Sequence, residues 1–233
     1  MPTVCGPSLA TFNNLIPRVM PIGDSITFGV GGTDQASYRT GVFNAMQTAG
    51  TPLYFVGSLS QGGTTLLNDP YNEGHSGYCV DAAAQSFFGS LTLVAVPHIP
   101  TYNPDLVILQ GGTNDIGEFL SDAPTVLAAL SAQLDAVWAL RTSSHFQIVQ
   151  FTILNRFDNS GYNTTVQTVN AGIPAMVAGK SYKSSITVVD IYSSVSSANI
   201  PGGLHPNDAG YTQYGAFIAA DSGWQRALSN ARG

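Results

Sequence analysis

Charged side chains are scarce in this sequence. Asp, Glu, Lys and Arg together make up 9% of the 233 residues, whereas about a quarter is usual in a soluble domain. The 8 Lys and Arg residues are scattered, and 14 Asp and Glu leave a formal net charge of −6. Nucleic-acid-binding proteins need clustered basic side chains to neutralise phosphates, so we expect no nucleic-acid partner. No apolar run approaches the roughly 18 residues that cross a membrane, so we expect no membrane partner either.

Cysteine is also scarce, with Cys5 and Cys79 the two in the chain. So low a count excludes a disulfide-dense small scaffold. Two interpretations of the pair stay open: a disulfide that pins the N-terminal segment, which we expect, and two buried free thiols. Residues 1–6 lack the charged-then-apolar pattern of a signal peptide, so the protein is either cytosolic or begins after a removed signal. The abundance of Ser, Thr, Asn and Gly favours a secreted, extracellular protein.

Apolar residues, in contrast, are plentiful at 44%, enough for one sizeable core. Nearly continuous apolar runs indicate strands of a parallel sheet that is covered on both faces; they are residues 19–22, 53–56, 106–109, 148–154 and 186–189. Stretches with a helical pattern alternate with them, at 41–49, 80–88, 124–140, 165–178 and after Asp208. Such alternation implies right-handed crossovers. The sequence therefore predicts an α/β fold with a doubly wound parallel sheet, in one domain over residues 1–233.

Polar residues follow two of the predicted strands at the edge where folds of this kind bind ligands. The first strand runs into Gly-Asp-Ser at 23–25, which places the hydroxyl of Ser25 at this edge. The third runs into Gly-Gly-Thr-Asn at 111–114, and the amide of Asn114 is a neutral donor suited to stabilising an oxyanion. Each segment also has a purely structural interpretation, because Asp-Ser and Asn-Asp pairs are common in turns and helix caps.

Two further loops complete the set of candidate residues. In the loop of small residues at 72–78, Gly77 can offer a backbone N–H to the same oxyanion. His205 follows the last predicted strand, in Gly-Gly-Leu-His-Pro at 202–206, where a structural loop histidine is the alternative. A serine nucleophile, a histidine base and convergent neutral donors are what cleavage of an ester needs. Together these residues predict an acyl-transfer enzyme.

These segments resemble the SGNH hydrolases, also called GDSL-type esterases, over residues 19–211. The resemblance rests on blocks in a fixed order: Gly-Asp-Ser-Ile at 23–26, Gly77, Gly-Thr-Asn-Asp at 112–115 and His-Pro at 205–206. Further segments are similar to the acetylxylan esterases of carbohydrate esterase family 3: Met-Pro-Ile-Gly-Asp-Ser-Ile-Thr at 20–27, Tyr-Arg at 38–39, Phe-Val-Gly-Ser at 55–58 and Glu-Gly-His-Ser-Gly-Tyr at 73–78.

The resemblance implies a flavodoxin-like three-layer α/β/α sandwich with about five parallel strands. It implies that Ser25 is the nucleophile and His205 the general base. The backbone N–H of Ser25, the N–H of Gly77 and the side-chain amide of Asn114 would form the oxyanion hole. No cofactor is implied. The implied reaction is the removal of acetyl groups from xylan or xylo-oligosaccharides by a secreted enzyme, which we expect to be a monomer.

The family pattern breaks at Gly202. The family usually carries Asp three residues before the catalytic histidine, and glycine stands there in this chain. In catalytic triads this acid orients the imidazole and stabilises the imidazolium, and disabling it costs about 10⁴-fold in rate. We therefore expect a Ser–His dyad in which a carbonyl of the Gly202–Gly203 turn, or an ordered water, orients His205. Asp190 and Asp208 are the alternative acids.

Other function classes stay open or are disfavoured by specific residues. An esterase or lipase-like enzyme for other acyl esters remains possible, as does a catalytically impaired carbohydrate-binding relative, which Gly202 would suit. A glycosidase needs paired carboxylates, and Glu73 and Glu118 are the only glutamates. An α/β-hydrolase would carry a G-x-S-x-G elbow, and the sequence has none. The 4 histidines lack metal-ligand spacing, so no catalytic metal is expected, while a structural cation stays open.

Overall fold

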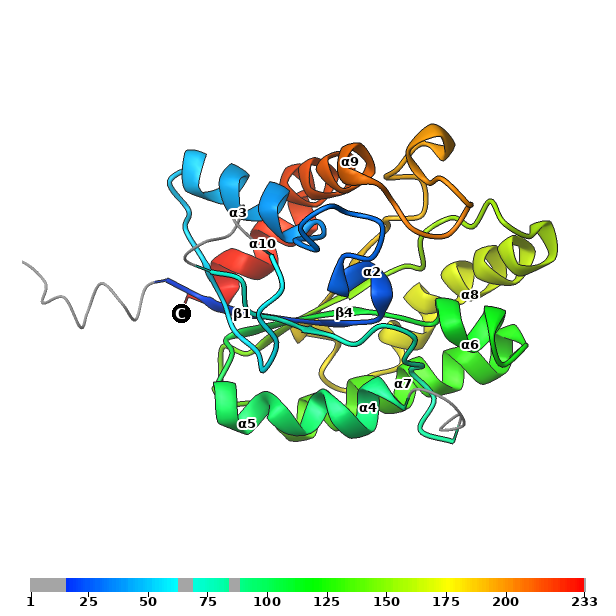
Figure 1. The fold of residues 1–233 in the computed structure, drawn as a ribbon. Coiled ribbons are helices and arrows are strands. Elements are labelled where there is room, and N and C mark those ends of the chain that lie inside the picture. The colour runs from blue at the N-terminus through cyan, green and yellow to red at the C-terminus, as the bar shows by residue number, and fades with distance from the viewer. Residues whose placement is uncertain (1–15, 63–68, 84–88, 233) are drawn as a thin grey trace, which may run out of the picture.

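The structure, a computed structural model, describes residues 16–62, 69–83 and 89–232. Within these residues a six-stranded sheet has the order β2–β1–β4–β5–β6, and β3 also pairs with β1 (Figure 1). The strands are β1 Arg18–Gly23, β2 Tyr54–Phe55, β3 Glu73–Gly74, β4 Leu106–Gln110, β5 Gln147–Phe151 and β6 Ile186–Val189. All the pairings are parallel.

This strand order confirms the predicted doubly wound, flavodoxin-like sheet. Without the two-residue β3, the order is the 2-1-3-4-5 of flavodoxin-like folds. Each of the five predicted strands is present, although the fourth ends at Phe151 rather than at residue 154. The chain leaves β1 toward β2 on one side and returns as β4 on the other, so the point where strand order reverses lies at the carboxyl ends of β1 and β4. Ligands bind at such a point.

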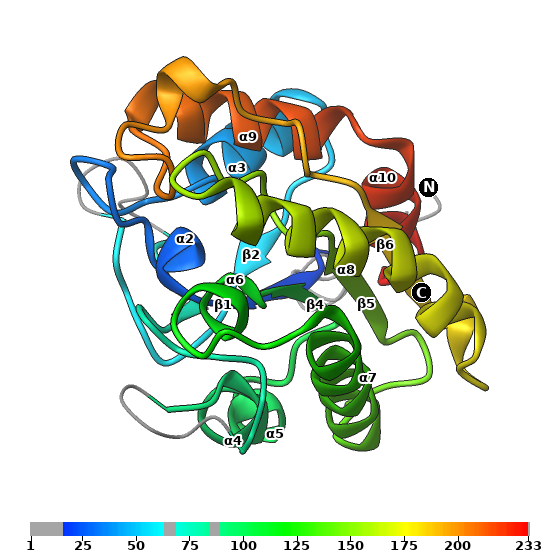
Figure 2. The same cartoon turned by 90° about the vertical axis from the view of Figure 1, so that its right-hand side faces the viewer.

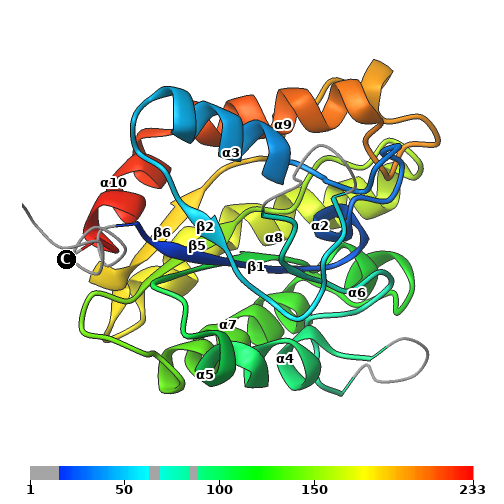
Figure 3. The ribbon, with the colours of Figure 1, turned by 60° about the vertical axis from the view of Figure 1, so that its left-hand side comes forward.

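Helices cover both faces of the sheet, as predicted (Figures 2 and 3). On one face lie α3 Arg39–Thr48, α9 Asp208–Ala220 and α10 Ser222–Asn230, and on the other α4 Leu91–Val94, α5 Ile99–Tyr102, α7 Ala123–Ala139 and α8 Ser160–Ala178. Side chains alternate along each strand between the two cores: Val19 joins the first and Met20 the second. The short elements are α2 Ser25–Phe28, α6 Thr113–Gly117, and the 3₁₀ turns η1 Val96–His98, η2 Lys183–Ser185 and η3 Ser197–Asn199.

Side-chain caps determine where the longer helices begin. The Asp122 carboxylate accepts a hydrogen bond from the Thr125 N–H at 3.0 Å and caps α7, a role for which Asp is a favoured residue. Asn159 caps α8 by accepting from the Gly161 N–H at 2.8 Å, so this helix begins earlier than the predicted 165. Helix α10 was not predicted. Asp221, with extended backbone, ends α9 and caps the next helix through the Trp224 N–H.

The predicted helix at 80–88 is wrong for residues 80–83, which are not helical; residues 84–88 lie outside the described residues. The backbone at Cys79 instead runs beside Ser90 in a bridge. The N–H groups of Val80 and Asp81 donate to the buried carboxylate of Asp115 at 3.0 and 2.9 Å. These long-range bonds hold the segment against α6, and the next helix begins only at Leu91.

Two sequence predictions concern cysteine and membrane association. Cys79 is buried, but Cys5 lies outside the described residues, so their disulfide stays a prediction. None of the described helices combines the length and the apolar character that a membrane span requires.

Candidate active site

Ser25 stands at the carboxyl edge of the sheet, directly beyond β1. The Asp24 carboxylate accepts from the Ile26 N–H at 2.9 Å and caps α2, of which Ser25 is the first residue. A Cβ at Gly23 would lie 2.2 Å from Thr27 Oγ1, so the sharp turn out of the strand requires glycine. The Ser25 residue is 4% exposed. The local sequence thus places a nearly buried hydroxyl at the first turn of a short helix.

The hydroxyl of Ser25 meets the imidazole of His205. Ser25 Oγ and His205 Nε2 are 2.8 Å apart. His205 lies in the loop between η3 and α9, and Gly31, in the segment after α2, packs against that loop. A Cβ at Gly31 would lie 2.4 Å from the Pro206 carbonyl oxygen and 3.2 Å from His205 Cβ, and its φ is +92°. Glycine at 31 therefore allows the loop to approach the serine.

Burial lowers the pKa of His205 from its ordinary 6.5, and the positive charge of Arg156 lowers it further, while Asp158 raises it in part. The imidazole is therefore neutral around neutral pH. A neutral imidazole can accept the proton of a serine hydroxyl, as a general base must.

The loop that carries Gly77 is held against the end of β1. Glu73 and Gly74 of β3 pair with the last two residues of β1, and the His75 N–H donates to the Gly23 carbonyl at 2.7 Å. Gly77 has a φ of +82°, the region in which glycine is strongly favoured. This pairing brings the Gly77 turn to the same sheet edge as Ser25.

Asn114 comes to this edge from the other neighbour of β1. It is the second residue of α6, which follows β4, and every residue of β4 pairs with β1. Its side-chain amide donates to the Tyr78 carbonyl at 2.8 Å, so one amide proton remains for another acceptor. Within the described residues, the N–H groups of Ser25 and Gly77 donate no hydrogen bond. These three donors can therefore serve a bound ligand.

A buried carboxylate supports the Gly77 loop, and the sequence had not indicated it. Glu73 is fully buried, and its oxygens lie 2.5 Å from the Ser58 nitrogen, 2.9 Å from His75 Nε2 and 3.0 Å from His98 Nδ1. Burial alone would raise the pKa of Glu73, but these hydrogen bonds outweigh it and hold that pKa below its ordinary value. Neither this cluster nor any other group of His, Cys, Asp and Glu side chains in the described part of the chain could hold a metal ion through three ligands.

Three of the groups expected to orient His205 accept hydrogen bonds from other residues. The Gly203 carbonyl accepts from the Phe157 N–H at 2.8 Å. Asp190 accepts from the Thr152 hydroxyl, and Asp208 accepts from the backbone and the hydroxyl of Thr33. In the described residues none of them bonds to the imidazole of His205. The charged residues that shift the pKa of His205 are Arg156 and Asp158. Neither was predicted from the sequence, although both follow the strand β5 at this same edge.

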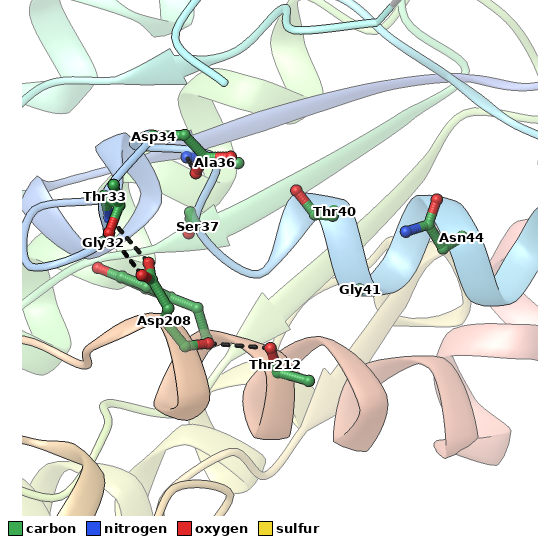
Figure 4. Close-up of a pocket in the computed structure, with 11 residues that line it drawn as sticks. Gly32, Thr33, Asp34, Ala36, Ser37, Thr40, Gly41, Asn44, Asp208 and Thr212 are labelled. Atoms are coloured by element: carbon green, nitrogen blue, oxygen red, sulfur yellow. Dashed lines mark hydrogen bonds between the residues drawn. The ribbon is translucent and has the colours of Figure 1, made fainter. Parts of the chain in front are cut away.

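A cavity of about 520 Å³ lies beside the site, between the segment 32–37 and the helices α3 and α9 (Figure 4). Its lining includes Thr33, Asp34, Asn44 and Thr212. Asp208 crosses one side of it, bonded to Thr33 through its carboxylate and to the Thr212 hydroxyl through its carbonyl. Neither the Ser25 hydroxyl nor the His205 imidazole lines this cavity.

Comparison with known proteins agrees with this arrangement. Residues 22–213 match the family described as GDSL-like Lipase/Acylhydrolase. The chain belongs to this family. A curated relative, a multidomain esterase of Ruminococcus flavefaciens, is 29% identical over 218 residues, which are 86% of this chain and 28% of that protein. The chain thus spans less than a third of the length of this relative.

Solved structures similar in fold to this GDSL-like protein include carbohydrate esterases. A family 3 carbohydrate esterase of Clostridium thermocellum has a TM-score of 0.67 and 25% identity, over 87% of this chain and 92% of that chain. A family 3 carbohydrate esterase of Talaromyces cellulolyticus has a TM-score of 0.66 and 23% identity, over 88% and 95%, and shows the fold alone. The predicted resemblance to the SGNH hydrolases and to carbohydrate esterase family 3 is confirmed.

Proposed function

We propose that this protein is a serine esterase that removes O-acetyl groups from xylan or xylo-oligosaccharides. The observation that carries the proposal is the 2.8 Å hydrogen bond between Ser25 Oγ and His205 Nε2. It lies at the carboxyl edge of the sheet in a member of an acylhydrolase family. A serine bonded to a neutral imidazole is the usual arrangement for nucleophilic attack on an ester.

In this mechanism the Ser25 oxygen attacks the acetyl carbonyl while His205 Nε2 takes the hydroxyl proton. The carbonyl oxygen becomes an oxyanion, stabilised by the N–H groups of Ser25 and Gly77 and by the amide of Asn114. The C–O bond to the sugar breaks, and the sugar oxygen leaves with the proton from His205. Water, deprotonated by the same imidazole, then attacks the acetyl-enzyme. The bond between the acetyl carbon and Ser25 Oγ breaks, His205 returns the proton to Ser25 Oγ, and acetate is released.

An acetylated carbohydrate is the substrate class best supported by the relatives. Solved structures of similar fold include proteins described as family 3 carbohydrate esterases. The helices that carry Ser25 and Asn114, α2 and α6, are 4 and 5 residues long, and neither forms a long apolar lid of the kind that would suit fatty acyl chains. We further propose that the protein is secreted and monomeric, and that it needs no cofactor.

The test compares Ser25→Ala with Ser229→Ala, a control on the exposed face of α10. Acetate release from acetylated xylan and hydrolysis of 4-nitrophenyl acetate are measured for each. Ser25→Ala should lose about 10⁴-fold or more in kcat, and Ser229→Ala should match the unmodified protein. Equal rates for the two variants would reject the mechanism. Hydrolysis of 4-nitrophenyl acetate without acetate release from xylan would reject the substrate and retain the esterase.

A further inference from the structure

Arg156 is a buried arginine whose guanidinium donates hydrogen bonds to two separate segments of the chain. The residue is 6% exposed. Nη1 donates to the Thr113 carbonyl at 2.9 Å. Nε and Nη2 donate to the two carboxylate oxygens of Asp158 at 3.0 and 2.5 Å, and the group stacks over the Tyr162 ring at 4.8 Å. A buried charge is tolerated only when paired and hydrogen-bonded in this way.

One side of this ion pair holds the helix that carries Asn114. Thr113, whose carbonyl accepts from Arg156, directly precedes Asn114 in α6. A Cβ at Gly117, the last residue of α6, would lie 2.2 Å from Arg156 Nη1. The guanidinium is therefore packed against this short helix from its first residue to its last.

The other side holds the loop that carries His205. The Phe157 N–H, between the two charged residues, donates to the Gly203 carbonyl at 2.8 Å. Gly203 has a φ of +83°, and a Cβ there would lie 2.2 Å from the Asp158 nitrogen. The backbone at 157–158 thus contacts the chain two residues before His205 with no space for a side chain.

We propose that Arg156 and Asp158 form a positioning pair that replaces, through packing and through the charge of Asp158, the acid that the family carries at the place of Gly202. This inference rests on the proposed roles of Ser25 and His205. The Asp158 carboxylate favours the imidazolium that forms when His205 takes the serine proton. Arg156 fixes that carboxylate and ties Asn114 to the same unit, so that base and oxyanion donor keep their relative positions.

The two charges of the pair act on the pKa of His205 in opposite directions. Burial and Arg156 lower the pKa of His205, and Asp158 raises it. On the opposite side, the segment packed on the loop presents the uncharged Gly31. Asp208, on α9, has both carboxylate oxygens bonded to Thr33. Among the described charged groups, the ion pair is therefore the one that acts on the imidazole.

The test is Asp158→Asn, with Asp135→Asn as matched control. Asp135 forms a comparable ion pair with Lys180 at 2.7 Å, between α7 and the end of α8. The Asp158 side chain is 25% exposed, and Asn keeps an oxygen for the guanidinium, so folding should persist. The NMR titration midpoint of the His205 ring should fall to lower pH. For 4-nitrophenyl acetate, kcat should fall about tenfold with KM unchanged.

Arg156→Gln should move the His205 midpoint in the opposite direction, to higher pH, because a positive charge is removed. A structural role alone predicts no such pair of opposite shifts. A midpoint and a kcat in Asp158→Asn equal to those of Asp135→Asn would overturn the proposal, as would shifts of the same sign in both pair variants. The ring titration needs no turnover, so failure of this pair and failure of the esterase mechanism are distinguishable.

Discussion

The hydroxyl of Ser25 and the imidazole of His205 lie within hydrogen-bond distance, 2.8 Å, although 180 positions separate them in the chain. Ser25 is placed by β1 and α2, and His205 precedes α9. Helix α9 packs closely on α3, where a Cβ at Gly215 would lie 2.7 Å from the Cα of Gly41. The contact between these helices therefore limits how far His205 can move from the serine.

This helix contact gives a first prediction. Gly215→Ala should destabilise the protein by about 1–3 kcal/mol, because the added methyl has no space against the backbone of α3. It should also lower kcat/KM, since α9 carries the His205 loop. Gly179→Ala is the control: this exposed glycine ends α8, and its Cβ would meet nothing closer than 3.4 Å. Urea unfolding and 4-nitrophenyl acetate kinetics measure both effects. Equal stability of the two variants would contradict the prediction.

The protonation of His205 predicts how activity depends on pH. Only the neutral imidazole accepts the serine proton, so kcat/KM should rise with pH and level off once the ring is deprotonated. Because burial lowers the pKa of this histidine, the midpoint should lie below the ordinary 6.5. The profile is measured with 4-nitrophenyl acetate between about pH 4 and pH 8. A midpoint at or above the ordinary value would show that the imidazole is more solvated than its burial indicates.

Asn114→Ala tests the side-chain donor of the oxyanion hole. Loss of one such donor should lower kcat about 10²-fold and change KM little, because the donor acts on charge that develops in the transition state. Asn44→Ala, on the exposed side of α3, is the control and should match the unmodified protein. If Asn114→Ala raised KM alone, the amide would be a substrate-binding group instead.

The two adjacent glycines before His205 should respond differently to substitution. Gly202 has a φ of +79°, and a Cβ added there would meet no atom within 4 Å, so Asp fits at a backbone cost of about 1 kcal/mol. Gly202→Asp restores the acid of the family, and kcat/KM should stay unchanged or rise. Gly203→Ala should lose both stability and activity, because its Cβ would lie 2.2 Å from the Asp158 nitrogen. Thermal unfolding and esterase kinetics measure each.

A large fall in the activity of Gly202→Asp, with an unchanged melting temperature, would contradict that expectation. It would show that the glycine conformation itself is needed at this position. A Gly203→Ala variant as stable as the unmodified protein would show that the 157–158 backbone moves away from the loop at little cost.

Local pattern was sufficient for the five main strands, for most of the longer helices and for the candidate residues. The run at 106–109 became β4 because a strand buried on both faces needs apolar side chains on both faces. Helix α7 begins where Asp122 caps it. Ser25, Gly77, Asn114 and His205 were found because each stands in a short motif at the end of a strand or in an edge loop, and such positions are recognisable within a few residues of sequence.

Contacts between distant segments were decided by the tertiary structure alone. The stretch at 80–83 has a helical pattern, yet the Asp115 carboxylate, more than thirty positions away, binds its N–H groups. Arg156 and Asp158 carry no motif, and their effect on His205 arises only when the turn at 157–158 packs on Gly203. The amino-acid order specifies the conformational preference of short segments and the periodicity of their apolar residues. The neighbours of a buried charge, in contrast, depend on how all the elements pack together.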